Sequence, residues 1–246
     1  MELKIIYEDN DVLVIDKPAG IIVFNESQSA EKSLIDLLIE LYPPLKNTGN
    51  MPRYGVVHRL DKDTSGIILV AKNNETLSFL QKQFKTRRVE KRYIALVSGN
   101  IENKEGTIET LIGRSPKDRI KQKVFLPGEP GSAGKRQALT SYKALEKFEK
   151  YTLLEVIPKT GRKHQIRCHL SYIHHPIAGD KLYGFKNQPC PKGLTRHFLH
   201  AGYLKIEMPS GETPHQSKHG TGQVKEFESE LPEDLKKIIN NLSSPS

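Results

Sequence analysis

The sequence predicts an α+β fold in which a largely antiparallel, mixed sheet carries flanking helices and loops. Strand-like segments follow one another without intervening helices over residues 4–17 and again over residues 106–158, which favours antiparallel pairing. Helical spacing of apolar residues is confined to a few short segments. The 246 residues include 36% hydrophobic and 27% charged residues, enough for a sizeable core in a soluble protein. We expect a single domain over residues 1–246.

The strand patterns begin almost at the N-terminus. "LKIIYED" and "VLVIDKP" are separated by Asn10 and Asp11, which are typical turn residues. The apolar run at residues 67–71 looks buried on both sides and is preceded by a strongly charged segment. The later strand patterns are "RYIALVSG", "GTIETLIG", "RQALTSYKALEKF" and "YTLLEVIP".

Four segments have the pattern of a helix. Ser33 can cap the first, and Asn73 or Asn74 can cap the second. The third is expected to start near Lys163, and the fourth, "PEDLKKIINNL", precedes a flexible tail at residues 241–246. Apolar side chains at helical spacing are Leu34, Leu37, Leu38 and Leu41, then Leu77, Leu80 and Phe84, then Ile166, Leu170 and Ile173.

The charge balance suggests a polyanionic partner. Lys and Arg number 38 against 29 Asp and Glu, a net charge of +9, and nucleic acid is the simplest partner for such an excess. Part of the charge is clustered, although for each cluster alone a solvated surface is the favoured interpretation. The first cluster is Lys82, Lys85, Arg87, Arg88, Lys91 and Arg92. The second is Lys117, Arg119, Lys121 and Lys123, which alternate as one face of a strand would.

Several other classes of protein are disfavoured by the sequence. No apolar run approaches the roughly 20 residues that cross a bilayer, so no membrane association is expected. No secretory signal is visible, and the two cysteines, Cys168 and Cys190, lack CxxC spacing, which predicts a reduced, cytoplasmic setting. The histidines around residues 164–175 show no familiar zinc spacing. Asp61 and Asp63 could bind Mg²⁺, but Lys62 separates them, and no metal site is expected.

Four polar stretches stand out among otherwise structural segments. They are "DKPAG" (16–20), "HRLDKDTSG" (58–66), "KRYIALVSG" (91–99) and "TGRKHQIRCHL" (160–170). In this order they resemble the RluA family of RNA pseudouridine synthases, and the nine residues 58–66 are the most specific part. The resemblance continues through "HPIAGDKLYG" (175–184), "RHFLHA" (196–201) and "LPEDL" (231–235), and so covers nearly the whole chain.

The resemblance implies the pseudouridine synthase catalytic fold with a cleft across the sheet. It implies that specific uridines in structured ribosomal or transfer RNA are isomerised to pseudouridine. The enzyme flips the nucleotide out of its stack, breaks the glycosidic bond and reattaches the uracil through C5. Because this is an isomerisation, neither a redox cofactor, nor ATP, nor a metal is expected.

Three residues match the catalytic positions of the family. Asp61 matches the catalytic aspartate, which either attacks C1′ or takes a proton from C2′, and a loop held between buried strands provides the rigidity that this chemistry requires. Arg167 matches the basic residue that pairs with the aspartate and keeps it ionised and oriented. Tyr93 matches the active-site tyrosine, whose ring can stack on uracil and whose hydroxyl is a candidate proton acceptor.

Further residues are expected to bind RNA. Arg59 matches a residue that enters the RNA stack where the target base was removed. His58 is expected to fix the loop by hydrogen bonds, and Lys17 either supports the pocket or contacts RNA. The remaining expected RNA contacts are Arg87, Arg88, Lys91 and Arg162.

The chain departs from the family pattern in three places. The strand pattern begins at residue 4, so we expect no N-terminal S4 module and a monomer whose catalytic domain alone recognises RNA. Phe24 stands where relatives commonly have His, and the polar segment 209–225 differs from the usual tail. One alternative is an RNA-binding or ribosome assembly factor with this fold and little or no catalysis. A glycoside-processing enzyme built on Asp61 and Asp63 ranks last, because carboxylates two residues apart rarely flank a sugar.

Overall fold

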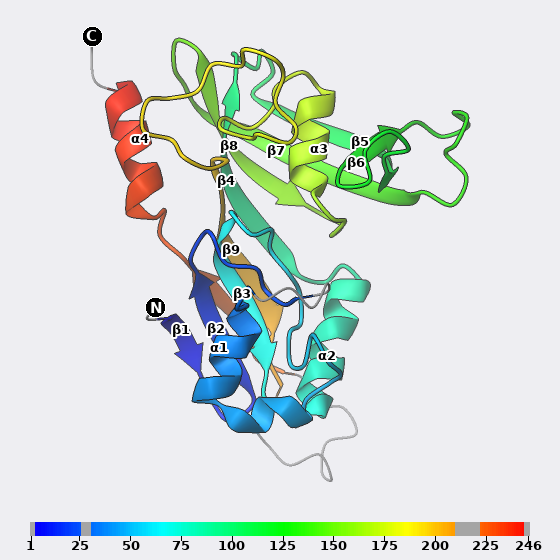
Figure 1. Ribbon diagram of the computed structural model, residues 1–246, viewed down its shortest axis with the longest axis vertical. Helices are drawn as coiled ribbons and strands as arrows, with labels where there is room; N and C mark the ends of the chain where they lie inside the picture. The colour runs from blue at the N-terminus through cyan, green and yellow to red at the C-terminus, as the bar shows by residue number, and fades with distance from the viewer. Residues whose placement is uncertain (1–2, 26–30, 210–221, 244–246) are drawn as a thin grey trace. The chain divides into compact units, whose positions relative to one another are not determined.

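The computed structural model describes residues 3–25, 31–209 and 222–243 (Figure 1). Within these ranges the chain forms ten strands, four α-helices and one short 3₁₀ helix, and the expected α+β class is confirmed. The chain separates into two compact units. Unit 1 is Met1–Glu90 with Ala201–Glu230, and unit 2 is Lys91–His200 with Leu231–Ser246. The expectation that residues 1–246 act as one catalytic domain stays a prediction.

Unit 1 is a sheet in the order β1-β2-β3-β9-β10. The pairs β1–β2, β2–β3 and β9–β10 are antiparallel. The strands are β1 (Lys4–Glu8), β2 (Val12–Lys17), β3 (Ser65–Ala71), β9 (Leu199–Glu207, which enters this unit at Ala201) and β10 (Val224–Glu228). The helices are α1 (Leu34–Leu41), the 3₁₀ helix η1 (Pro43–Asn47) and α2 (Asn74–Lys85).

Alternate residues of β2 face the two helices of unit 1. Val12 and Val14 pack in one apolar cluster with Leu77 and Leu80 of α2. Leu13 and Ile15 pack in a different cluster with α1. Successive side chains of a strand point to opposite faces, so both faces of β2 and β3 are covered. This is why these two strands are continuous apolar runs in the sequence.

The two helices of unit 1 begin where side chains can cap them. The Ser33 hydroxyl accepts from the Asp36 N–H, while the Asp36 carboxylate accepts from the Ser33 N–H at 2.9 Å, which completes a capping box. The Asn73 side chain accepts from the Thr76 N–H at 2.9 Å, so Asn73, one of the two predicted caps, is the residue that caps α2.

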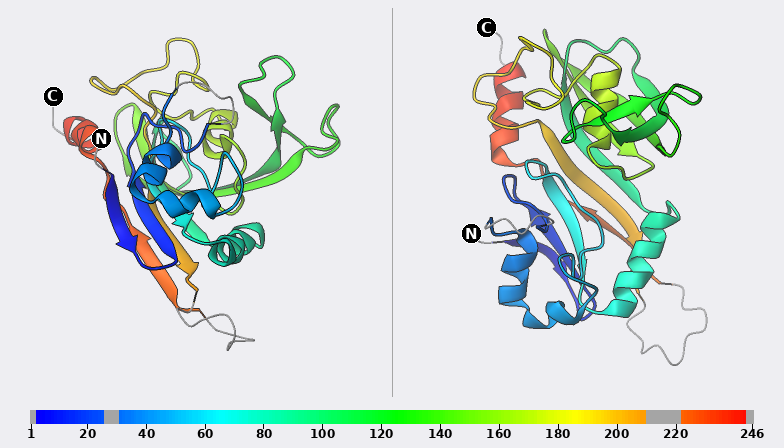
Figure 2. Two further views of the ribbon diagram at one scale, coloured as in Figure 1. Left: turned by 60° about the horizontal axis from the view of Figure 1, so that its bottom comes forward. Right: turned by 45° about the vertical axis from the view of Figure 1, so that its right-hand side comes forward.

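Unit 2 is a sheet in the order β4-β8-β7-β5-β6, and all its neighbouring pairs are antiparallel. Its strands are β4 (Glu90–Ser98), β5 (Glu105–Arg114), β6 (Gln122–Phe125), β7 (Arg136–Lys147) and β8 (Tyr151–Pro158). Helix α3 (Gln165–Tyr172) lies against β6, β7 and β8 (Figure 2). The core joins β4 and β8 to α3 and to α4 (Glu233–Ser243).

Of two local predictions in unit 2, one is confirmed and one was wrong. Helix α3 begins at Gln165, two residues after Lys163, and His164 before it has a left-handed backbone with φ of 54°. Lys117 and Arg119 do not lie on a strand, because β6 starts only at Gln122. The Asp118 carboxylate accepts from the Ile120 N–H at 2.9 Å and turns the chain there, so the basic residues do not alternate on one face.

The C-terminal segment is also more ordered than expected. Helix α4 continues to Ser243, so residues 241–243 are helical, while residues 244–246 lie outside the described part. Arg196 holds the start of the helix through a bidentate pair with Asp234, at 2.7 and 3.2 Å. Of the polar segment 209–225, residues 210–221 lie outside the described part, and β10 begins at Val224. Among the described helices, none has the length and apolar character that crossing a membrane requires.

Candidate active site

The loop that contains Asp61 is held from both ends in unit 1. Before the loop, the Val57 N–H donates to the Leu69 carbonyl at 3.2 Å, and after it the chain enters β3. Within the loop, the Lys62 carbonyl accepts from the Gly20 N–H at 2.9 Å. The "DKPAG" turn and the "HRLDKDTSG" loop are therefore joined directly.

Lys17 is part of this support and not an RNA contact. Its side chain is fully buried, and Nζ donates to the carbonyl oxygens of Pro18 (2.8 Å), Ile21 (2.9 Å) and Lys62 (2.9 Å). A buried ammonium group requires such acceptors, since it carries three donors and no acceptor. Of the two roles expected for Lys17, these bonds indicate support of the pocket, because one of them holds the carbonyl of Lys62, the residue next to Asp61.

His58 fixes the same loop, as expected. Its Nε2 accepts from the Leu69 N–H at 3.1 Å, and its ring stacks on Phe84 of α2 with centroids 4.7 Å apart. A direct contact between His58 and RNA stays a prediction.

Asp61 itself lies at the start of a tight turn and is half-buried. Its carbonyl accepts from the Thr64 N–H at 3.1 Å, and Thr64 and Ser65 are buried as the chain turns into β3. Gly66 follows with φ of 114°, and a Cβ there would collide with the Ala201 carbonyl of β9. The glycine in "DTSG" is therefore required by the close approach of β9, and the turn presents the Asp61 side chain from a rigid backbone.

Arg167 lies in unit 2, on α3, and is bound by a carboxylate that the sequence analysis missed. Its Nε donates to Asp180 Oδ2 at 2.7 Å and its Nη2 to Asp180 Oδ1 at 2.9 Å. Burial would raise the pKa of Asp180, but the Arg167 guanidinium and the Tyr183 N–H together hold that pKa below its ordinary value. Asp180 belongs to the "HPIAGDKLYG" segment, which was recognised only as part of the resemblance.

Buried polar side chains lock α3 onto the sheet of unit 2. The His169 ring bonds the hydroxyls of Thr140 (2.9 Å) on β7 and Thr110 (3.0 Å) on β5. Gln165 donates to Thr140 Oγ1 at 2.9 Å and accepts from the Thr160 hydroxyl at 2.7 Å. Burial lowers the pKa of His169 to about 4, so its ring is neutral at pH 7. These bonds fix the helix that carries Arg167.

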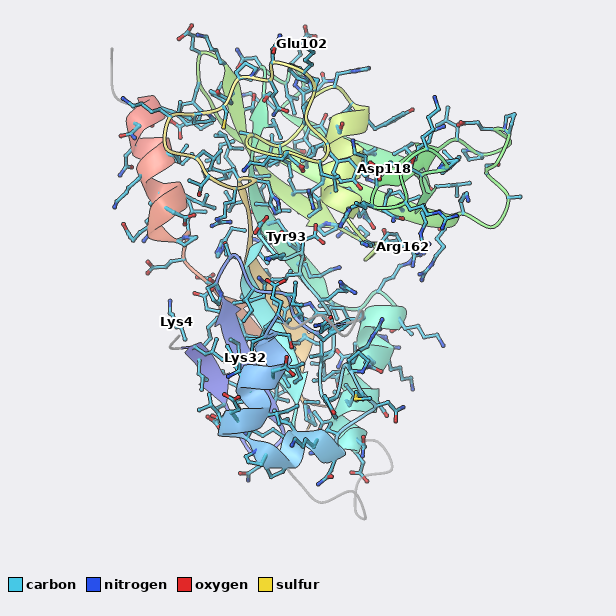
Figure 3. The ribbon with its side chains drawn as sticks, in the orientation of Figure 1. Lys4, Lys32, Tyr93, Glu102, Asp118 and Arg162 are labelled. Carbon is cyan, nitrogen blue, oxygen red and sulfur yellow. The ribbon has the colours of Figure 1, made fainter. Side chains whose placement is uncertain are left out.

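Tyr93 and Lys91 lie two residues apart on β4, so they share one face of that strand. Tyr93 is half-buried and opposite Val156 of β8, while burial and the nearby charge of Lys159 lower the pKa of Lys91 to about 8. Arg162 lies before α3, where its Nε donates to the Gln137 carbonyl at 3.0 Å; Figure 3 labels Tyr93 and Arg162.

Arg87 and Arg88 are exposed at the C-terminal end of α2 in unit 1. The Arg88 N–H donates to the Gln83 carbonyl and the Arg87 N–H to the Phe84 carbonyl, the two bonds of a Schellman motif. Arg87 has φ of 62° at the position that glycine usually occupies in this motif. Arg87 thus occupies a backbone conformation that favours glycine.

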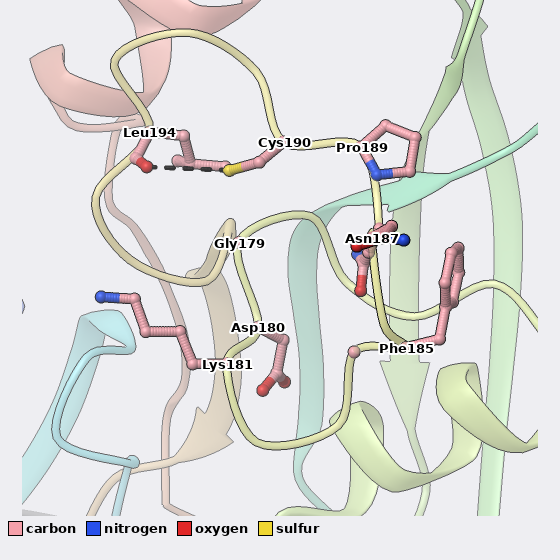
Figure 4. A pocket seen from close by; sticks show the side chains of 10 residues that line it. Gly179, Asp180, Lys181, Phe185, Asn187, Pro189, Cys190 and Leu194 are labelled. Carbon is pink, nitrogen blue, oxygen red and sulfur yellow. Dashed lines mark hydrogen bonds between the residues drawn. The ribbon is translucent and has the colours of Figure 1, made fainter.

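A surface pocket of about 360 Å³ lies in unit 2 beside Asp180 (Figure 4). Its walls come from residues of the segment 179–194, including Phe185, which is 54% exposed. Within the described ranges, no group of three or more histidine, cysteine or acidic side chains could hold a metal ion.

Comparisons with known proteins identify the family. Residues 11–172, which carry the Asp61 loop, Tyr93 and Arg167, match the family described as RNA pseudouridylate synthase. The chain belongs to that family.

Similar proteins support the assignment of the chain to this family. The uncharacterized RNA pseudouridine synthase YlyB of Bacillus subtilis is 39% identical over 242 residues, covering 98% of this chain and 73% of that protein. Ribosomal large subunit pseudouridine synthase D of Nitrosomonas europaea is 39% identical over 243 residues, which cover 96% of this chain and 64% of that protein. The chain thus spans less than two thirds of the second relative. The structure of human RNA pseudouridylate synthase domain containing 4 matches 97% of this chain and 92% of that one, with 25% identity and a TM-score of 0.73.

The enzyme is therefore a pseudouridine synthase that acts on RNA, and the reading as a binding factor without catalysis is not favoured. Asp61, Arg59, His58, Arg87 and Arg88 lie in unit 1. The expected site residues of unit 2 are Tyr93, Lys91, Arg162 and Arg167. Their catalytic and binding roles are proposals.

Proposed function

We propose that this synthase isomerises specific uridines of structured RNA by base flipping, with Asp61 acting on the ribose of the extracted nucleotide. The observation that carries the proposal is the Asp61 loop, which Lys17 and Gly20 hold through the Lys62 carbonyl and which Gly66 closes against β9. A carboxylate on so rigid a backbone can be held at the distance and angle that attack on C1′ or proton removal from C2′ requires.

Arg167 is proposed to orient the Asp61 carboxylate during the reaction. The two bonds to Asp180, from Nε and Nη2, hold the guanidinium group in place on α3. The half-buried Tyr93 would supply a face on which the flipped uracil stacks.

The RNA contacts are proposed to come from exposed and half-buried basic side chains of both units. They are Arg59, Arg87 and Arg88 of unit 1, and Lys91 and Arg162 of unit 2. The relative named ribosomal large subunit pseudouridine synthase D makes ribosomal RNA the first substrate to test, with transfer RNA as the second. The proposal includes a cytoplasmic enzyme that acts as a monomer on RNA without a metal or another cofactor.

Tritium release tests the proposal directly. RNA labelled at uridine C5 is isolated from cells that lack this protein and divided into ribosomal and transfer pools. Formation of the C1′–C5 bond replaces the C5 hydrogen, so isomerisation releases tritium into water. The wild type should release tritium from one pool, and Asp61→Ala should release none.

Asp63→Ala is the matched control, because it removes a carboxylate from the same loop two residues away. It should retain most of the activity of the wild type. Appreciable release by Asp61→Ala would refute the catalytic assignment. Equal loss in Asp63→Ala would show that the loop, and not the Asp61 carboxylate, is what the reaction needs.

A further inference from the structure

Phe24 lies just beyond the "DKPAG" turn of unit 1. Its side chain is only 4% exposed and packs in the apolar cluster that contains α1. Two arginines lie over its ring. The guanidinium carbon of Arg59 is 4.7 Å from the ring centroid, and that of Arg53 is 4.9 Å away.

The Phe24 ring stabilises both guanidinium groups where they lie. Its negative faces attract cations, and one such contact changes an equilibrium about 2- to 5-fold at an exposed site. A histidine in this place would be a weaker partner, and a repulsive one when protonated. Since each guanidinium carbon is within 5 Å of the same centroid, the two are at most about 10 Å apart. The ring thus lies against two like charges.

The backbone that carries Arg53 is tied to the strand that follows the Asp61 loop. The Arg53 N–H donates to the Asn50 carbonyl and its carbonyl accepts from the Val56 N–H, both at 2.9 Å. The Ala71 N–H of β3 donates to the Gly55 carbonyl at 2.8 Å. The backbone segments that carry Arg53 and Arg59 are therefore both hydrogen-bonded to β3. The fold thus fixes the distance between the backbone positions of the two arginines.

We propose that Arg53 and Arg59, held by Phe24, form a two-arginine site for the phosphodiester backbone of the RNA beside the target nucleotide, so that Arg59 contacts phosphate instead of entering the RNA stack as the resemblance implies. Arg53 is a further RNA-binding residue, and Phe24 is a positioning residue that acts through the two arginines. Planar guanidinium forks suit phosphate oxygens, and both arginines are exposed. The inference rests on the proposed function, because it takes Arg59 to face the substrate.

Salt-dependent binding tests the role of Arg53. The full-length protein is titrated against labelled large-subunit ribosomal RNA by filter binding between 50 and 200 mM salt. Arg53→Gln should weaken binding about 3- to 10-fold and reduce the slope of log K against log salt by about 0.7 to 0.9, as loss of one phosphate contact does. Lys46→Gln removes the same charge from an exposed position on η1 and should leave the slope unchanged. Equal effects of the two variants would overturn the site.

A double-mutant cycle tests the role of Phe24. Phe24→Leu keeps an apolar side chain without the aromatic ring, and should weaken binding about 3-fold or more, while Phe24→Tyr should restore it. In an Arg53→Gln, Arg59→Gln background, Phe24→Leu should have no further effect on binding. An undiminished effect there would show that Phe24 acts by packing alone. Thermal unfolding checks that Phe24→Leu is folded; if it is not, Arg53→Gln and Phe24→Tyr carry the test.

Tritium release by the wild type separates this inference from the proposed function. Tritium release together with an unchanged salt slope for Arg53→Gln would refute the two-arginine site alone. A reduced slope without tritium release from either RNA pool would refute the proposed reaction and keep the site. Absence of RNA binding by the wild type would refute both.

Discussion

The buried His169 ring predicts how the stability of unit 2 depends on pH. The ring lies between Thr140 and Thr110 with no exposed surface, and burial lowers its pKa from 6.5 to about 4. In the unfolded chain the ring would titrate at its ordinary value. Between pH 6.5 and pH 4 the unfolded state therefore binds more protons than the folded state. Stability is fully present above pH 6.5 and is lost as the pH falls through this window.

The size of the effect follows from the two pKa values. Lowering the pH from 7 to 5 should cost about 2 kcal/mol of unfolding free energy through this one residue. The assay is urea denaturation at both pH values, with the wild type compared with His169→Gln, which does not titrate. Subtracting the two proteins removes the contributions of the other histidines and the carboxylates. We expect the wild type to lose about 2 kcal/mol more than the variant.

Two outcomes would refute this reasoning. Equal losses in the two proteins would mean that His169 is protonated in the folded state without penalty, so its surroundings accommodate the charge. A larger loss in the variant would mean that the charged ring is stabilised by the fold. Either result would also weaken the argument that a neutral, hydrogen-bonded His169 fixes the helix that carries Arg167.

Three further predictions concern other residues of the two units. Asp180→Asn leaves the buried Arg167 without its carboxylate partner. It should lower stability by about 3 kcal/mol in urea denaturation and slow tritium release about 100-fold. Release by the variant at the rate of the wild type would exclude a positioning role. Lys17→Met deprives three carbonyl oxygens of their donor, and should cost about 2 to 4 kcal/mol, whereas a loss below about 1 kcal/mol would contradict its role as the loop's anchor. Arg87→Gly relieves a left-handed backbone, and should raise stability by about 1 kcal/mol while it weakens RNA binding; a drop in melting temperature would contradict the assigned strain.

Much of the fold could be predicted because its signals are local. Ser33 and Asn73 cap helices through N–H groups three residues away, and such patterns can be read within one turn. The continuous apolar runs of β2 and β3 likewise reflect burial on both faces. One local prediction failed where a turn changed the backbone. The turn at Asp118 prevents a basic strand face.

The candidate site was predictable only in part. The Asp61 loop and the position of Tyr93 on a strand followed from short motifs. Asp180 was missed, because no spacing links it to Arg167, thirteen residues earlier on a different element. The sequence left open whether Lys17 supports the pocket or contacts RNA, because its acceptors lie up to 45 residues away.

By itself, the sequence determined the α+β class, the helix starts at their caps and the motifs that place this chain among the RNA pseudouridine synthases. Only the tertiary structure decided that Lys17 is buried, that Asp180 holds Arg167 and that Phe24 lies against Arg53 and Arg59. The physical reason is the range of the interactions. Caps and strand patterns act between neighbours in the chain, whereas burial and charge pairing depend on segments that meet only after folding, as when His169 meets Thr110 from 59 residues away.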